Sequence, residues 1–297
     1  MKILAFFIFG IQFPIFSQML DNSKGEAFGD LPFFNQDFIR RNKIKQITGA
    51  HSAKRQGELI NDTDLKSVYE FDSLGRLIHH YETVFDKKEF DTLLTAYIYD
   101  SSGAITSIRT VGNGGTSSLR YVRDSSHRVS EKSFVKEIDT SGSILDNEPE
   151  LITIINSEFM KYDSVPLELR CKYSNSYGFS YMDKSWYYHP EGYLLREEER
   201  LRMTNGLTVH SYAYNERGYI SSVSTDLNGD GAPEKQLAFT YDEMGNLLEK
   251  KVYKNNDFLY EVQIIYNSKT GLMSSIFTRD IKTGFISIYR FSKYTYW

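Results

Sequence analysis

The feature that most constrains this chain is a short motif that recurs along it. Two aromatic residues separated by one position are followed by a polar residue, usually Asp or Asn, then two further residues and glycine. Clear copies span residues 69–75, 97–103, 186–192, 212–218 and 239–245, and decayed copies span 121–127 and 264–271. The glycines lie 28 residues apart from 75 to 103, 26 from 192 to 218, 27 from 218 to 245 and 26 from 245 to 271. This regularity predicts one structural unit repeated in tandem.

The motif is typical of a hairpin corner. Aromatic residues at positions i and i+2 point to the same face of a strand. Asp or Asn then opens a type I turn and bonds back to the turn amides, and glycine closes the turn in the left-handed conformation. An apolar residue two positions after the glycine begins the returning strand.

A period of about 26 residues leaves room for two strands and two turns. The second turn of each unit is therefore expected midway between motifs, where turn-forming residues do occur. These candidates are residues 86–88, 112–115, 204–206, 228–231, 255–257 and 282–284. The predicted fold class is all-β, with tandem antiparallel β-hairpin repeats forming an extended, twisted meander sheet that is open or partly curled.

Composition agrees with a sheet-rich chain. The 297 residues include 22 Tyr and 20 Phe, although only 40% are hydrophobic. Tyrosine favours strands in which its ring packs and its hydroxyl stays wet, so we expect a half-exposed sheet without a deep core. The net charge of -4 gives no electrostatic case for binding nucleic acid. The single cysteine, Cys171, cannot form an internal disulfide and is interpreted as an inert buried thiol.

The first 17 residues are typical of a secretory signal peptide. Lys2 precedes an apolar run over residues 3–16, and Ser17 is a small residue before a cleavage point at Gln18. The run is too short to span a bilayer as a helix, and no later segment is apolar enough to do so. We therefore expect an exported protein of the periplasm, cell surface or extracellular medium.

The remaining chain divides into two parts. Residues 18–42 are expected to form a loop with a short helix that Asp30 caps and that runs through Phe34 and Phe38. Residues 43–297 form the hairpin array, starting with a strand from residue 43. Residues 143–185 carry only degenerate aromatic pairs and are either an insertion or eroded repeats.

The motif resembles the signature of the RHS/YD-repeat family, Tyr-x-Tyr-Asp-x-x-Gly-Arg-Leu. Residues 69–77 come nearest to it, and the resemblance covers roughly residues 43–297. The resemblance implies a β-hairpin array on a secreted or surface protein, here similar to exported proteins of the Bacteroidetes type. Large members spiral into shells around toxins, but this chain is too short to close such a shell and has no recognisable toxin module.

One loop has the pattern of a calcium site. Residues 226–234 offer side-chain oxygens at positions 1, 3 and 5, a backbone carbonyl at 7 and a carboxylate at 9, which suits a hard cation. The proposed ligands are Asp226, Asn228, Asp230, Ala232 and Glu234. Position 12 is Leu237, so the EF-hand form is incomplete, and a polar hairpin turn without an ion is the competing interpretation.

Other polar clusters are expected to be structural. His79 and His80 are neighbours on a strand, so they face opposite sides and cannot share an ion, and both are interpreted as surface residues. Glu197 and Glu199 share a face opposite Glu198, and the surrounding arginines predict a solvated ladder of charges. No catalytic or nucleotide-binding motif occurs, so no catalytic residue is nominated.

Three functions remain open. The main expectation is a non-catalytic exported β-repeat scaffold that binds a cell-surface protein or a carbohydrate through exposed aromatic residues. The second is an outer-membrane β-barrel ending at the aromatic Trp297, although charges on both faces of residues 195–202 oppose a lipid-facing surface. The third is a hydrolase whose site is assembled from distant residues.

Overall fold

The computed structural model describes residues 18–29, 31–86, 89–138 and 151–297, so the expected signal peptide and Asp30 lie outside the described residues. One helix and eighteen strands lie within these ranges. They are α1 (Gln36–Arg41), β1 (Ile44–Lys54), β2 (Asn61–Phe71), β3 (Leu77–Asp86), β4 (Glu89–Tyr99), β5 (Ile105–Gly112), β6 (Gly115–Arg123), β7 (Val129–Ile138), β8 (Leu151–Val165), β9 (Glu168–Asn175), β10 (Ser180–Tyr188), β11 (Leu194–Leu201), β12 (Leu207–Tyr214), β13 (Ile220–Asp226), β14 (Lys235–Tyr241), β15 (Leu247–Lys254), β16 (Asp257–Tyr266), β17 (Met273–Asp280) and β18 (Ile286–Tyr296).

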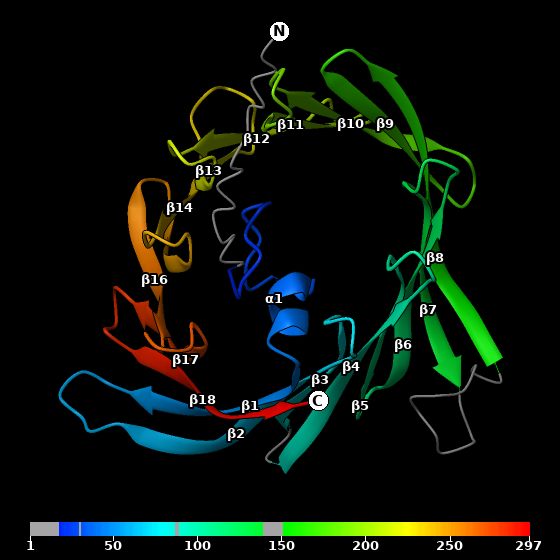
Figure 1. The fold of residues 1–297 in the computed structure, drawn as a ribbon. Coiled ribbons are helices and arrows are strands. Elements are labelled where there is room, and N and C mark those ends of the chain that lie inside the picture. The colour runs from blue at the N-terminus through cyan, green and yellow to red at the C-terminus, as the bar shows by residue number, and fades with distance from the viewer. Residues whose placement is uncertain (1–17, 30, 87–88, 139–150) are drawn as a thin grey trace, which may run out of the picture.

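The strands close into a barrel. Each strand pairs antiparallel with its neighbours in the chain, and β18 returns to pair with β1, from Ile44 opposite Tyr296 to Lys54 opposite Ile286. Figure 1 shows the resulting ring. The predicted open or partly curled sheet is therefore wrong. Pairing the first strand with the last satisfies the backbone groups that an open sheet would leave exposed at two edges. The barrel alternative describes this architecture better than the open scaffold.

The predicted turn chemistry is confirmed at the motif corners. In the corner between β2 and β3, the Asp72 carboxylate accepts hydrogen bonds from the backbone amides of Leu74 and Arg76. Gly75 closes the turn with φ +83°, in the left-handed region. The decayed copy at residues 121–127 keeps the same geometry, with His127 in place of glycine at φ +61°. The second turns also fall between strands where expected, apart from residues 87–88, which lie outside the described residues.

Tyrosines of the motif link neighbouring units. The hydroxyl of the second motif aromatic donates to a backbone carbonyl of the preceding unit, at the start of its returning strand. The bonds are Tyr99 to Leu77 (2.7 Å), Tyr214 to Leu194 (2.7 Å), Tyr241 to Ile220 (2.8 Å), Tyr266 to Leu247 (3.0 Å) and, from a related position in β18, Tyr294 to Met273 (2.6 Å). We call these five bonds the tyrosine ladder. The expectation that the hydroxyls stay wet is wrong at these positions.

The N-terminal segment, residues 18–29 and 31–43, lies inside the barrel. In Figure 1 this segment and α1 lie within the ring of strands. Asn35 caps α1, since its side chain accepts from the amide of Phe38. The expected helix through Phe34 is therefore wrong in its start: Phe34 precedes the helix and instead forms a β-bridge with Leu20.

This segment supplies a core that composition did not predict. Met19, Leu20, Phe38 and other residues of the segment pack in one cluster with inward-facing strand residues such as Phe239. Polar contacts fix the segment as well: the Asn22 amide donates to the Tyr241 hydroxyl (2.8 Å). Burial of these apolar side chains stabilises the closed barrel around its own N-terminal segment.

Residues 151–185, which carry only degenerate aromatic pairs, continue the antiparallel meander. They form β8, β9 and most of β10, so the antiparallel strand order continues through this stretch; residues 139–150 lie outside the described residues. The turn after β9 keeps the corner geometry, because Asn175 accepts from the amides of Tyr177 and Phe179 and Gly178 has φ +80°. Only the aromatic pairing before this turn is lost.

The outer face of the barrel carries charge. Alternation along the strands turns Glu249 and Glu261 outward, where they pair with Lys251 (3.0 Å) and Arg279 (2.8 Å). A face that contacts lipid must be apolar, so these pairs oppose lipid contact at β15 to β17. Among the described residues, no helix is both long and apolar enough to cross a membrane.

Candidate functional site

A large cavity lies between the N-terminal segment and one wall of the barrel. Its volume is about 770 Å³, and its wall belongs to β10 to β14 and the corners between them. Six tyrosines line it: Tyr188, Tyr193, Tyr212, Tyr214, Tyr219 and Tyr241. The segment adds polar groups, among them Asp21, Asn22, Asp37 and Arg41. We call this space the tyrosine chamber.

The hairpin repeat explains why tyrosines gather there. Tyr212 and Tyr214 are the aromatic pair of one motif copy, and alternation points both rings into the barrel. Rings from neighbouring units meet, with centroids 5.0 Å apart for Tyr193 and Tyr214 and 5.1 Å apart for Tyr219 and Tyr241. The result is an aromatic wall built from several repeats.

The hydroxyls of this wall fall into two groups. Those of Tyr214 and Tyr241 belong to the tyrosine ladder. Among the described residues, the hydroxyl of Tyr212 forms no hydrogen bond, and its pKa is raised, mainly by burial. The chamber therefore offers both ring faces and at least one hydroxyl that can bond to a ligand.

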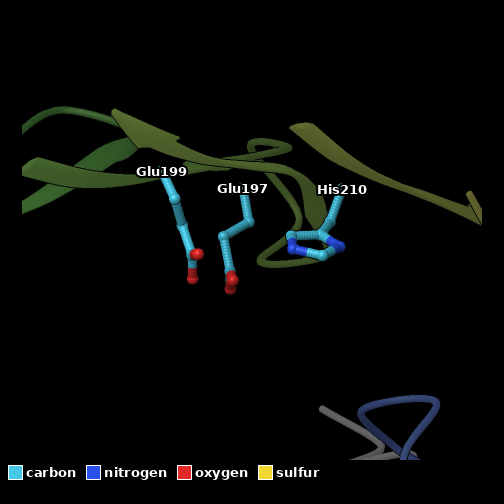
Figure 2. A group of neighbouring side chains, drawn as sticks. All are labelled: Glu197, Glu199 and His210. Atoms are coloured by element: carbon cyan, nitrogen blue, oxygen red, sulfur yellow. The ribbon is translucent and has the colours of Figure 1, made fainter. Parts of the chain in front are cut away.

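A charged cluster continues the same wall on β10 to β12. Glu197, Glu199 and His210 point into the barrel side by side (Figure 2), with ligand atoms all within 4.8 Å of one another. The Lys184 ammonium from β10 lies between the two carboxylates, 2.5 Å from Glu197 and 2.8 Å from Glu199. Burial lowers the pKa of Lys184, but its hydrogen bonds to both glutamates outweigh this effect and leave it raised.

This cluster is an ion-pair network. The Lys184 ammonium pairs with both carboxylates and also lies 5.2 Å from the centre of the Trp186 ring. A metal ion would have to displace that ammonium. His210 bonds through Nδ1 to the Thr225 hydroxyl (3.0 Å), which fixes its ring. The expected solvated ladder is correct in its alternation of faces, but Glu197 and Glu199 line the barrel interior.

The predicted calcium loop joins β13 and β14. The Asp226 carboxylate accepts from the amides of four loop residues, Asn228, Gly229, Asp230 and Gly231. Burial raises the pKa of Asp226, but these hydrogen bonds outweigh it and hold the pKa below its usual range. Glu234 folds back to accept from the Asn228 side chain (2.5 Å). Asp226, Asn228 and Glu234 (positions 1, 3 and 9 of the loop) therefore lie together, whereas the Asp230 carboxylate accepts from the Ala232 amide (2.9 Å). Calcium binding stays a prediction.

Two smaller expectations have different outcomes. His79 and His80 do face opposite sides: His79 bonds to Glu70 (3.0 Å) on the outside, while His80 stacks on Tyr69 inside the barrel at 4.3 Å. The surface interpretation is therefore wrong for His80, whose pKa burial lowers to about 4. Cys171 is buried, as expected, and burial raises its pKa to about 11.

No family model matches the chain, and no curated protein matches it. Among solved structures it is similar to a chain of the Tc holotoxin pore of Photorhabdus luminescens, with 11% identity and a TM-score of 0.30, covering 75% of this chain and 19% of that chain. It is also similar to a porin-like protein from Bacteroides uniformis (10% identity, TM-score 0.31, 86% of this chain and 97% of that chain). A LolA superfamily protein from Nitrosomonas europaea has 9% identity and a TM-score of 0.25, over 86% of this chain and 90% of that chain. At these scores the likenesses carry no argument about function.

Proposed function

We propose that this protein is an exported, non-catalytic binding protein that holds a carbohydrate in its tyrosine chamber. The observation that supports this proposal is the chamber itself, with about 770 Å³ lined by six tyrosines and by polar groups of the N-terminal segment. Flat aromatic faces pack on the apolar faces of sugar rings, and convergent carboxylate, amide and guanidinium groups pair with hydroxyls.

The binding surface proposed here differs from the one expected for an open array. Closure turns one aromatic face of every motif inward, so the ligand is enclosed by the repeats. The network of Lys184, Glu197 and Glu199 also argues against the hydrolase alternative, because one ammonium holds both carboxylates as paired anions. A general acid and a nucleophile need two carboxyl groups in different environments.

The outer-membrane alternative makes a separate prediction. A membrane-embedded barrel would fractionate with outer membranes, whereas the charged outward face at β15 to β17 favours an aqueous compartment. We also propose membership of the RHS/YD-repeat family, which the motif and its confirmed corner geometry support. Fractionation of cells that produce the full chain distinguishes the outer membrane from an aqueous compartment. Recovery of the protein only from washed outer membranes would reject the aqueous location.

Tryptophan fluorescence provides a direct test of carbohydrate binding. The chain has two tryptophans, and Trp186 lies on the inner wall two residues before Tyr188 of the chamber. In a Trp297→Phe background, titration with a panel of soluble oligosaccharides should shift the emission of Trp186.

The matched variants are Tyr212→Ala, inside the chamber, and Tyr253→Ala, on the outer face, where Tyr253 stacks on Phe258 at 5.1 Å. Tyr212→Ala should weaken binding about fivefold to more than a hundredfold, since loss of the ring's contacts costs on the order of 1 to 3 kcal/mol. Tyr253→Ala should leave it unchanged. Equal affinity in both variants, or no saccharide response at all, rejects the proposal.

A further inference from the structure

A second large cavity lies along a different wall of the barrel. It has a volume of about 690 Å³ and separates Gly29 and residues 31–33 of the N-terminal segment from the inner face of β2 to β7. Five aromatic residues line it: Phe33, Tyr69, Tyr97, Tyr121 and Phe134. This cavity shares no lining residue with the tyrosine chamber.

Among the described residues that line this cavity, Glu82 is the acidic one. It lies on β3, directly opposite Ser67 of β2 and Leu93 of β4, neither of which carries a charge. Within the described ranges its carboxylate forms no ion pair or hydrogen bond. Burial raises the pKa of Glu82, which is the expected effect on a carboxylate without a compensating cation.

The other titratable residues of the lining do not offset this charge. His80 is on the same strand and is neutral at physiological pH, because burial lowers its pKa to about 4. Lys132 is on β7, four strand spacings from β3. At about 4.8 Å per spacing, its backbone lies roughly 19 Å across the sheet from that of Glu82. The negative charge of Glu82 therefore faces an aromatic cavity.

We propose that this second cavity binds an organic ammonium ion, with Glu82 as its counter-ion and the surrounding aromatic rings as its walls. A single carboxylate offers too few oxygen ligands for a metal ion such as calcium, which takes six to eight. Aromatic faces attract organic cations within about 6 Å of the ring centre, and a carboxylate adds direct charge pairing. The ligand class is thus a substituted amine or quaternary ammonium compound of a size that fits 690 Å³.

Choline and its uncharged carbon isostere, 3,3-dimethylbutan-1-ol, test the proposal on the full chain. The two ligands have the same shape and differ in charge, so isothermal titration should detect choline binding that is at least about tenfold tighter than binding of the isostere. This comparison needs no altered protein. Equal affinity for the two ligands, or no heat with choline at tens of millimolar, overturns the proposal.

Variants locate the binding site. Glu82→Gln should weaken choline binding at least about tenfold, and Tyr69→Leu, which removes the ring diagonally across from Glu82 on β2, should weaken it severalfold. Glu58→Gln, in the exposed turn between β1 and β2, is the matched control and should bind as the unaltered protein does. Undiminished choline binding by a folded Glu82→Gln protein would refute the assignment. Saccharide binding in the tyrosine chamber should be the same in all three variants, so the two proposals fail separately.

Discussion

Removal of the tyrosine ladder, one hydroxyl at a time, should measure how strongly adjacent hairpins hold each other. In a Tyr→Phe variant the ring stays and only the hydroxyl is lost, so the carbonyl of the preceding unit loses its partner. A net intramolecular hydrogen bond is worth about 1 kcal/mol, and an acceptor that water cannot reach costs up to about 3 kcal/mol when its partner is removed.

The structure ranks these positions. Tyr266 donates to Leu247, which is 0% exposed, whereas Tyr214 donates to Leu194, which is half-buried. Tyr266→Phe should therefore lower the free energy of unfolding by about 1.5 to 2 kcal/mol, and Tyr214→Phe by about 0.5 to 1 kcal/mol. The two bonds share no partner, so the double variant should lose about the sum.

Urea denaturation provides the assay. Each variant should lower the midpoint without changing the slope, because the surface exposed on unfolding is the same. Tyr253→Phe is the control, since Tyr253 lies on the outer face, and it should stay within about 0.5 kcal/mol of the unaltered protein. If Tyr266→Phe cannot be distinguished from this control, the hydroxyl bonds do not link the units and the reasoning is wrong.

Three further predictions concern the N-terminal segment, the inner wall and the loop after β13. Gly75 and Gly103 occupy equivalent corners with φ +83° and +87°, but a Cβ on Gly75 would lie 2.2 Å from the Gln36 carbonyl oxygen, while one on Gly103 meets open space. The left-handed backbone should destabilise both alanine variants by about 1 kcal/mol, and the clash with Gln36 should destabilise Gly75→Ala by a further 1 to 3 kcal/mol. Thermal unfolding measures the difference, and equal melting temperatures for the two variants would show that the contact is absent. Burial lowers the pKa of His80 from 6.5 to about 4, so between these pH values the unfolded chain binds a proton at His80 and the folded chain does not. Stability should therefore be complete above about pH 6.5 and should fall by about 1 to 2 kcal/mol towards pH 4, a loss that His80→Asn should reduce when unfolding is measured across this range. Millimolar calcium should give calorimetric heat that Asp230→Asn abolishes, and a titration without such heat leaves the loop as a hydrogen-bonded turn.

Local chemistry made the hairpins predictable. An Asp72 or Asn215 that opens a turn, and a glycine that closes it, act within five residues, so their consequences can be read from the sequence. The period of the motifs then indicated two antiparallel strands in each unit. Alternation also placed His79 and His80 on opposite faces correctly.

Closure depended on contacts between residues about 240 positions apart, such as Gly49 opposite Phe291, and no local pattern specifies such a pairing. The interior position of the N-terminal segment was missed for the same reason. Without a closed barrel, Glu197 and His80 had no interior to face, so both were assigned to the surface. The apolar residues Met19 and Leu20 next to the expected cleavage point were the available signal that this segment is buried.

The barrel is assembled from two-stranded units, so its circumference can change only in steps of two strands. Barrel diameter grows roughly in proportion to strand number, so gain of one unit would enlarge the cross-section by about a quarter, and loss of one would shrink it by about a fifth. The N-terminal segment has a fixed volume and contacts the inner wall at several strands, with Phe34 against Phe71 of β2 and Met19 against Met273 of β17. The segment therefore selects one strand number among the barrels that this repeat could build. With eighteen strands, the ring holds the segment in contact with its wall and leaves space for the two cavities beside it.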